Sequence, residues 1–185
     1  MNYLPRTIQP VIEEASKFFK IVMVSGMRQV GKSTLLKQLS SDKRTIISFD
    51  DINNLESAKN APLQFLQLNP PPCFFNQVQR VPEIFKALKI SVDSRSEKGL
   101  YWLSGSQKLS LMSQVSDALP GRLMNFELWP FSIYEIAGKG LEQKPYLPSF
   151  SLSSNLPILD PADTWNAVFQ GYSTELKKAT ETERS

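Results

Sequence analysis

The octapeptide GMRQVGKS at residues 26–33 constrains the fold of this chain more than any other feature. It matches the pattern G-x-x-x-x-G-K-[ST], in which two glycines let the backbone turn its N–H groups inward around an anion. An apolar run, KIVMVSG (20–26), precedes it, and GKSTLLKQLSS (31–41), with its leucines on one helical face, follows it. The sequence therefore predicts a buried strand, a phosphate-binding turn and a helix N-terminus in succession.

This loop predicts a nucleotide site. Lys32 is expected to reach the β- and γ-phosphates, and the Ser33 hydroxyl is expected to be a magnesium ligand. No Asn-Lys-x-Asp motif for reading guanine occurs in the chain, so ATP is favoured over GTP. The predicted cofactor-binding residues are Gly26, Met27, Arg28, Gln29, Val30, Gly31, Lys32, Ser33 and Thr34.

Helices and strands alternate along the chain, which predicts an α/β fold with a parallel sheet covered on both faces. Helices are expected at 8–19, 31–41, 55–68 with an interruption before Pro62, 82–97 and 108–119, and strands at 20–26, 44–51, from 73, 99–106 and 122–132. The aromatic segments LYW (100–102) and ELWPF (127–131) are interpreted as core.

The composition changes at about residue 139. The following stretch is rich in Pro, Ser and Gly and has no hydrophobic period, which is typical of a linker. We therefore expect a nucleotide-binding domain at 1–138, a linker at 139–161, and the start of a C-terminal helical region at 162–185.

Composition excludes several kinds of chemistry. The chain has no histidine, which excludes Ser-His-Asp hydrolysis, imidazole acid-base catalysis and His-ligated zinc. With Cys73 as the only cysteine there is no disulfide framework, in agreement with a cytoplasmic setting. The net charge of +3 is too small to indicate nucleic-acid binding. No apolar run approaches the roughly 20 residues of a membrane span, and no export signal begins the chain, so no membrane partner is expected.

Several segments together resemble one known group, the mostly prokaryotic AAA-type P-loop ATPases, whose phosphate loop reads G-x-R-Q-V-G-K-[ST] and whose acidic strand reads D-E-x-Q-R-x-P. The matching segments are GMRQVGKS (26–33), QVQRVP (77–82), LSGSQ (103–107), LPGR (119–122), PFSIYE (130–135) and FQGYSTEL (169–176), the last similar to a segment that usually reads G-x-x-P-E-L.

The resemblance implies a three-layer P-loop NTPase sandwich with a mainly parallel five-stranded sheet in the order 5-1-4-3-2. Members of the group are about twice as long and carry a C-terminal domain of uncertain function. The resemblance thus implies that this chain is a fragment, a split-gene product or a shortened form. A protein or DNA partner is expected through the missing C-terminal half.

The stretch CFFNQVQR (73–80) departs from the family motif. Aligned to it, Asn76 occupies the place of the Asp that orders magnesium through water, and Gln77 that of the Glu that polarises the attacking water. A side-chain amide accepts a hydrogen bond, but it brings no negative charge to a metal and takes no proton. We therefore predict ATP binding with impaired hydrolysis, in a nucleotide-dependent switch or assembly module, with Ser33 and Asn76 as the metal-site residues.

The resemblance also assigns residues beyond the strand. Ser106 or Gln107 stands where a polar side chain usually senses the γ-phosphate, although Gln107 also suits an ordinary helix start. Arg122 stands where a neighbouring subunit's arginine finger often originates, which implies a homo-oligomer, although a solvated turn arginine is an equal description. The predicted catalytic residues are Gln77, Gln107 and Arg122. Gln79 and Arg80 match the family signature, but the sequence gives them no chemical role.

Alternatives remain open from the sequence. One is that the chain is an engineered, ATP-trapping form of an active ATPase, because paired Asp→Asn and Glu→Gln changes trap bound ATP. A second is an active ATPase in which Asp50, Asp51 or a partner's carboxylate takes the place of the missing acids. Asp50 and Asp51 equally suit a helix N-cap. Another alternative is an interaction module that binds no nucleotide, in which Lys32 is a surface charge.

Overall fold

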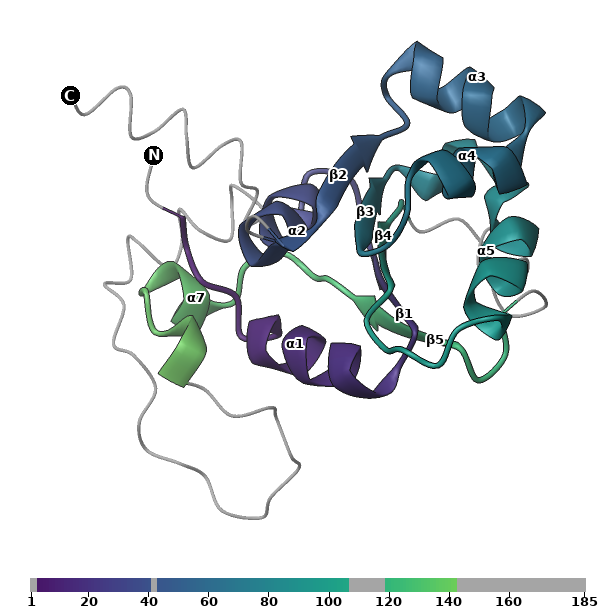
Figure 1. Cartoon of the computed structure of the whole chain (residues 1–185). Coiled ribbons are helices and arrows are strands. Elements are labelled where there is room, and N and C mark those ends of the chain that lie inside the picture. Colours follow the sequence, from purple (N-terminus) through teal and green to yellow (C-terminus); the bar gives the residue numbers. More distant parts are fainter. Residues whose placement is uncertain (1–2, 41–42, 107–118, 143–185) are drawn as a thin grey trace.

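A single parallel sheet organises the molecule (Figure 1). The computed structural model describes residues 3–40, 43–106 and 119–142. The strands are β1 (Ile21–Ser25), β2 (Thr45–Ser48), β3 (Cys73–Asn76), β4 (Tyr101–Ser104) and β5 (Leu123–Glu127). Their order is β2-β3-β4-β1-β5, with every neighbouring pair parallel. This is the expected order 5-1-4-3-2 counted from the opposite edge, so the predicted fold class is confirmed.

Helices cover both faces of this sheet, and they connect its strands. They are α1 (Gln9–Phe18), α2 (Lys32–Ser40), α3 (Ile52–Asn60), α4 (Pro62–Leu68), α5 (Ile84–Asp93) and the short α7 (Ile133–Ile136), with 3-10 turns at Val78–Arg80 and Gly140–Glu142. In Figure 1, α3, α4 and α5 lie together on one side of the sheet, away from α1 and α2. The arrangement has three layers, as predicted.

Alternate side chains of each strand enter two separate cores, because successive residues of a strand point to opposite faces. In β1, Ile21 and Met23 join the core formed with α3, α4 and α5. Val22 and Val24 join the core under α1 and α2. The strand is buried on both faces, as its continuous apolar sequence indicates.

The predicted interruption before Pro62 is confirmed. A proline disfavours helical backbone in the residue before it, and Ala61 has a φ of −142° and a ψ of 67°. Helix α3 therefore ends at Asn60, and α4 begins at Pro62. The pair packs against the sheet as two short helices instead of one long helix.

The core interpretation of the aromatic segments is confirmed for LYW, whereas in ELWPF it holds for Leu128 and is wrong for Trp129. Trp102 of LYW is 4% exposed in β4, but Trp129 of ELWPF is 65% exposed. Strand β5 ends at Glu127, and Leu128, the next residue, is still buried. The apolar run continues past the end of the strand, so the side chain of Trp129 is exposed to solvent.

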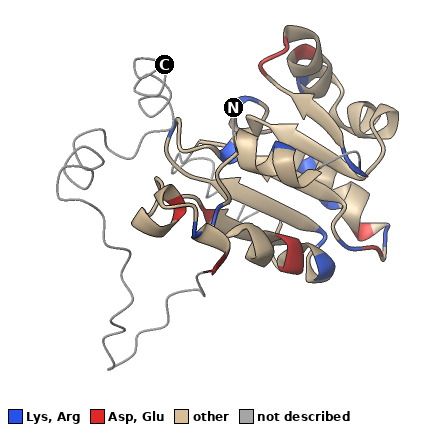
Figure 2. Cartoon of the chain, turned by 90° about the vertical axis from the view of Figure 1, so that its left-hand side faces the viewer, with Lys and Arg blue, Asp and Glu red and all other residues tan. Residues whose placement is uncertain are grey.

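Several expectations fall on residues outside the described ranges. These are the helix at 108–119 except for its last residue, the linker except for residues 139–142, the region 162–185, and the segment FQGYSTEL. The domain division at residue 138 stays a prediction. Within the described ranges, no helix is both long and apolar enough to cross a membrane. Basic and acidic residues are interspersed over the face seen in Figure 2.

Candidate functional site

The predicted phosphate-binding turn connects the end of β1 to the start of α2. Gly26 has a φ of +142° and Gly31 a φ of +91°, which are backbone conformations that side chains other than hydrogen rarely allow. A Cβ atom on Gly26 would lie 2.4 Å from the carbonyl oxygen of Leu128. The first glycine of the motif is therefore required both by the turn and by the close approach of the segment after β5.

Lys32 begins α2 and is 9% exposed. Its Nζ donates to the carbonyl oxygen of Gly26 at 3.0 Å and to that of Met27. Burial lowers the pKa of the Lys32 ammonium, because the charged form loses hydration. A phosphate would supply the negative charge that these neutral carbonyls do not.

Asn76 is the centre of a hydrogen-bond network at the carboxyl ends of the strands. Its Oδ1 accepts from the hydroxyl of Ser33 at 2.6 Å and from that of Ser104 at 2.7 Å. Its Nδ2 donates to the hydroxyl of Ser48 at 3.2 Å. The carboxyl ends of parallel strands meet at one sheet edge, so β2, β3, β4 and α2 each contribute one member. The structure thus brings together Ser33 and Asn76, the two residues predicted for the metal site.

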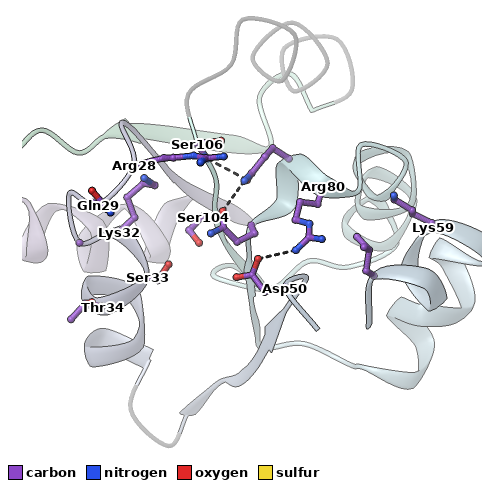
Figure 3. A pocket seen from close by; sticks show the side chains of 14 residues that line it. Arg28, Gln29, Lys32, Ser33, Thr34, Asp50, Lys59, Arg80, Ser104 and Ser106 are labelled. Atoms are coloured by element: carbon purple, nitrogen blue, oxygen red, sulfur yellow. Dashed lines mark hydrogen bonds and ion pairs between the residues drawn. The ribbon is translucent and has the colours of Figure 1, made fainter. Parts of the chain in front are cut away.

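Gln77 follows Asn76 with a φ of +64°. Its Oε1 accepts from Nε2 of Gln79 at 2.7 Å, and Oε1 of Gln79 accepts from the backbone N–H of Ser106 at 3.2 Å (Figure 3). Gln79 therefore connects the end of β3 to the end of β4. Sequence reasoning gave Gln79 no role, although its place in the QVQR segment was a signal. Gln107 lies outside the described residues.

Ser33, Gln77, Gln79, Ser104 and Ser106 line an open cavity of about 820 Å³ (Figure 3). Asn76 is 7% exposed and does not line it. Its lining includes four cationic residues, Arg28, Lys32, Lys59 and Arg80, and one acidic residue, Asp50. Arg80 donates to Asp50 at 2.9 Å. The excess of positive charge suits an anionic ligand such as a nucleotide's phosphates. Lys59, on α3, also lines the cavity, and no motif in the sequence pointed to it.

The predicted cofactor-binding residues divide into two groups. Those that line the cavity are Arg28, Gln29, Gly31, Lys32, Ser33 and Thr34. Gly26, Met27 and Val30 do not line it. The Met27 side chain is 60% exposed, while Val30 is buried and contributes to the second core. The motif therefore supplies both ligand-facing residues and residues that shape the turn.

Asp50 and Asp51 occupy different environments. Asp51 is the N-cap of α3, and its Oδ1 accepts from the N–H of Asn53 at 2.8 Å, so the cap interpretation is confirmed for this residue. Asp50 lines the cavity and pairs with Arg80. Of these two carboxylates, only that of Asp50 lines the cavity.

Arg122 lies at the other end of the sheet. It immediately precedes β5, and the first residue of β5, Leu123, pairs with Ile21 at the start of β1. The phosphate-binding turn, in contrast, follows the end of β1. The guanidinium of Arg122 makes a two-point ion pair with Asp93, with Nη2 3.1 Å from Oδ2. Arg122 therefore does not join this chain's own cavity. An action in a neighbouring copy stays a prediction.

Arg6 connects the phosphate-binding turn to the segment after β5. Its Nη1 donates to the carbonyl oxygen of Val30 at 2.8 Å, and Nη2 donates to that of Trp129 at 2.6 Å. Its Nε lies 3.1 Å from Oε1 of Glu135, without the alignment of a hydrogen bond, and its guanidinium lies 4.3 Å from the centre of the Phe131 ring. Both charged side chains are almost fully buried.

Glu135 completes this arrangement, which we call the Arg6 clamp (Arg6, Val30, Trp129 and Glu135). Oε1 of Glu135 also accepts from the N–H of Thr7 at 2.7 Å, and Oε2 accepts from that of Ser132 at 2.8 Å. Neither charged residue was assigned a role from the sequence, although Glu135 is the last residue of the PFSIYE segment. The clamp joins the N-terminal segment, the turn and the segment after β5.

The parallel sheet and the turn between β1 and α2 define the class of P-loop nucleotide-binding domains. A family model described as an AAA domain matches residues 18–137, and the chain therefore belongs to this family. Membership of this family indicates a nucleotide-binding, ATPase-like function.

Two curated relatives are similar to the chain. They are uncharacterized proteins of Mycobacterium bovis and Mycobacterium tuberculosis, each 27% identical over 141 residues. Each match covers 73% of this chain and 32% of the relative. The chain thus spans about a third of the length of the curated relatives it matches.

Proposed function

We propose that this chain is an ATP-binding domain that turns ATP over slowly or not at all and acts as a nucleotide-dependent switch or assembly module. The observation that carries the proposal is that a complete phosphate-binding turn stands beside a neutral amide, Asn76, which accepts a hydrogen bond from Ser33. Lys32 and the turn supply what phosphate binding needs, whereas Asn76 and Gln77 supply no carboxylate for hydrolysis.

The chemistry of the site fits ATP accompanied by Mg²⁺, as is usual in this family. The hydroxyl of Ser33 is a hard oxygen ligand of the kind that Mg²⁺ prefers, and it donates a hydrogen bond to Oδ1 of Asn76 at 2.6 Å. Among the described residues there is no group of three or more His, Cys, Asp or Glu side chains that would hold a metal alone. The ion, when bound, would neutralise phosphate charge. Ser33 would be its protein ligand, and Asn76 would orient Ser33 without adding charge.

The first test is isothermal calorimetry of ATP with Mg²⁺ on the chain and on Lys32→Ala. We expect binding by the chain and a loss of about 10–100-fold in affinity in the variant, because a charge-assisted contact to phosphate is removed. Lys37→Ala is the matched control, since Lys37 is exposed on the same helix and lines no part of the cavity. Equal affinity in all three proteins, or heat from none, would favour an interaction module without a nucleotide site.

A second candidate function is an ATPase that uses Asp50. The observation in its favour is that Asp50 lines the cavity, while Asp51 is occupied as a helix cap. This candidate predicts Mg²⁺-dependent phosphate release by the unmodified chain that falls to background in Asp50→Asn and persists in Asp51→Asn. Arg80 binds the carboxylate of Asp50, so we expect no such release. Release that is insensitive to both substitutions would exclude these two side chains as the base.

A further inference from the structure

A second cavity lies at the opposite end of the sheet from the phosphate-binding turn. It has a volume of about 290 Å³, at the small end of ligand pockets. Its walls come from α1, the end of α2, and the residues at the start of β2, β3 and β4. They are Glu13, Ser16, Lys17, Leu39, Ser40, Lys43, Arg44, Pro72, Lys98, Gly99 and Trp102. Because it faces away from the carboxyl ends of the strands, this cavity shares no residue with the nucleotide site.

Its charge is strongly unbalanced. Four lining residues are cationic, and Glu13 is the one acidic residue among them. Lys17 pairs with Glu14, which leaves Lys43 and Lys98 as exposed ammonium groups without an ion-pair partner in the described ranges. Lys43 and Arg44 are adjacent in sequence, and Lys98 comes from the turn before β4, so the fold itself gathers these cations around one hollow.

Arg44 is the innermost of these cations. Its guanidinium lies 4.0 Å from the centre of the Trp102 ring, and Nη2 donates to the Ser16 hydroxyl at 3.3 Å. Its Nη1 is buried and has no hydrogen-bond partner among the described residues. A partly buried guanidinium is costly unless a negative charge lies near it, and such a charge can approach Arg44 only on the side that lines the cavity, not at the buried Nη1.

Among the described residues, no acidic side chain forms an ion pair with Arg44. Burial lowers the pKa of the Arg44 guanidinium to about 10, so the group is still charged at neutral pH but is poorly compensated. The group that acts on it electrostatically is Cys73, and burial raises the pKa of that thiol to about 11. The thiol is therefore neutral at pH 7 and offers no counter-charge.

From the uncompensated Arg44, flanked by Lys43 and Lys98 in a small cavity, we propose a second anion site that takes a phosphate-type oxyanion. The oxyanion would lie against the exposed side of the guanidinium and accept hydrogen bonds from the two ammonium groups. The indole face of Trp102 is covered by Arg44, so the site binds through charge and not through base stacking. The oxyanion is either free inorganic phosphate or a phosphate of a single-stranded nucleic acid.

The test uses the full chain carrying Lys32→Ala, so that the phosphate-binding turn does not contribute. Binding of inorganic phosphate is followed by ³¹P NMR titration, and binding of a labelled 12-nucleotide single strand by fluorescence anisotropy. We expect Lys43→Ala with Lys98→Ala to weaken binding at least about tenfold, through loss of charge-assisted hydrogen bonds. Tighter binding of the oligonucleotide than of phosphate would identify the polymer as the source, and the reverse would identify the free ion.

The matched control is Lys86→Ala with Lys89→Ala, which makes the same change in net charge with exposed lysines of α5. Cations near helix C-termini also stabilise helices. If that were the only role of Lys43 and Lys98, their removal would lower thermal stability and leave phosphate binding equal to the control, which would overturn the proposal. Absence of binding of both probes to the Lys32→Ala chain would overturn it as well.

Discussion

Replacing Arg6 by alanine is expected to lower the free energy of unfolding by about 3–5 kcal/mol, the usual cost of removing one partner from a buried ion pair. Glu135 would remain buried without its counter-charge, and the carbonyl oxygens of Val30 and Trp129 would each lose a donor. Urea denaturation followed by circular dichroism measures the change.

Two further variants identify the cause of that loss. Arg6→Ala combined with Glu135→Gln removes both charges and keeps a side-chain oxygen as an acceptor beside the N–H groups of Thr7 and Ser132, so it should cost less than Arg6→Ala alone. Lys17→Ala breaks the exposed pair with Glu14 and should leave the denaturation midpoint nearly unchanged. If Arg6→Ala behaved like Lys17→Ala, the clamp would not contribute to stability.

Restoring both acids, by Asn76→Asp with Gln77→Glu, is expected to raise the rate of ATP hydrolysis by about 10²–10⁴-fold, the range of general-base assistance. The site accommodates an aspartate at 76, because the hydroxyls of Ser33, Ser48 and Ser104 all surround this side chain and can donate to a carboxylate. Phosphate release under saturating ATP and Mg²⁺ is the measurement.

Single substitutions separate the two contributions. Asn76→Asp alone should strengthen the dependence of ATP binding on Mg²⁺ and change turnover little, whereas Gln77→Glu alone restores the base without the charge beside the metal. Adding Lys32→Ala to the doubly restored chain should abolish the gain. No turnover in the restored chain would refute the claim that the two amides are the site's only defect.

The phosphate-binding turn and the parallel character of the sheet could be predicted from local signals in the sequence, whereas the order of the five strands came from the family resemblance. Glycines and Lys-Ser at fixed spacing specify the turn, and alternating apolar segments specify parallel strands with helical crossovers. The position of Asn76 beside Ser33 followed from the resemblance, and the structure places the two side chains in contact.

The Arg6 clamp was beyond sequence reasoning for a physical reason. Arg6 and Trp129 are 123 positions apart, and neither a hydrophobic period nor a short motif relates them. The same holds for the second cavity, whose cations come from α1 and from the turns before β2 and β4. Lysine and arginine in turns usually indicate only solvent exposure, and their convergence appears only once the strands are placed in order. Gln79 is different, because it lies in a segment that matches the family motif. Its hydrogen bonds to Gln77 and Ser106, however, could not be predicted from the spacing of residues in the sequence.

The Arg6 clamp extends beyond the region of the chain that matches the family model. The matched region begins at residue 18, so it leaves out Arg6 and all but the last residue of α1, yet Arg6 supports the turn through Val30. A piece of the chain cut at the boundaries of the family match would keep every residue of the GMRQVGKS motif but would lose Arg6 and its hydrogen bond to Val30. The boundaries of the family match therefore differ from the boundaries of the residues that contact the turn, and we expect a piece that begins at residue 18 to be less stable than one that includes Arg6.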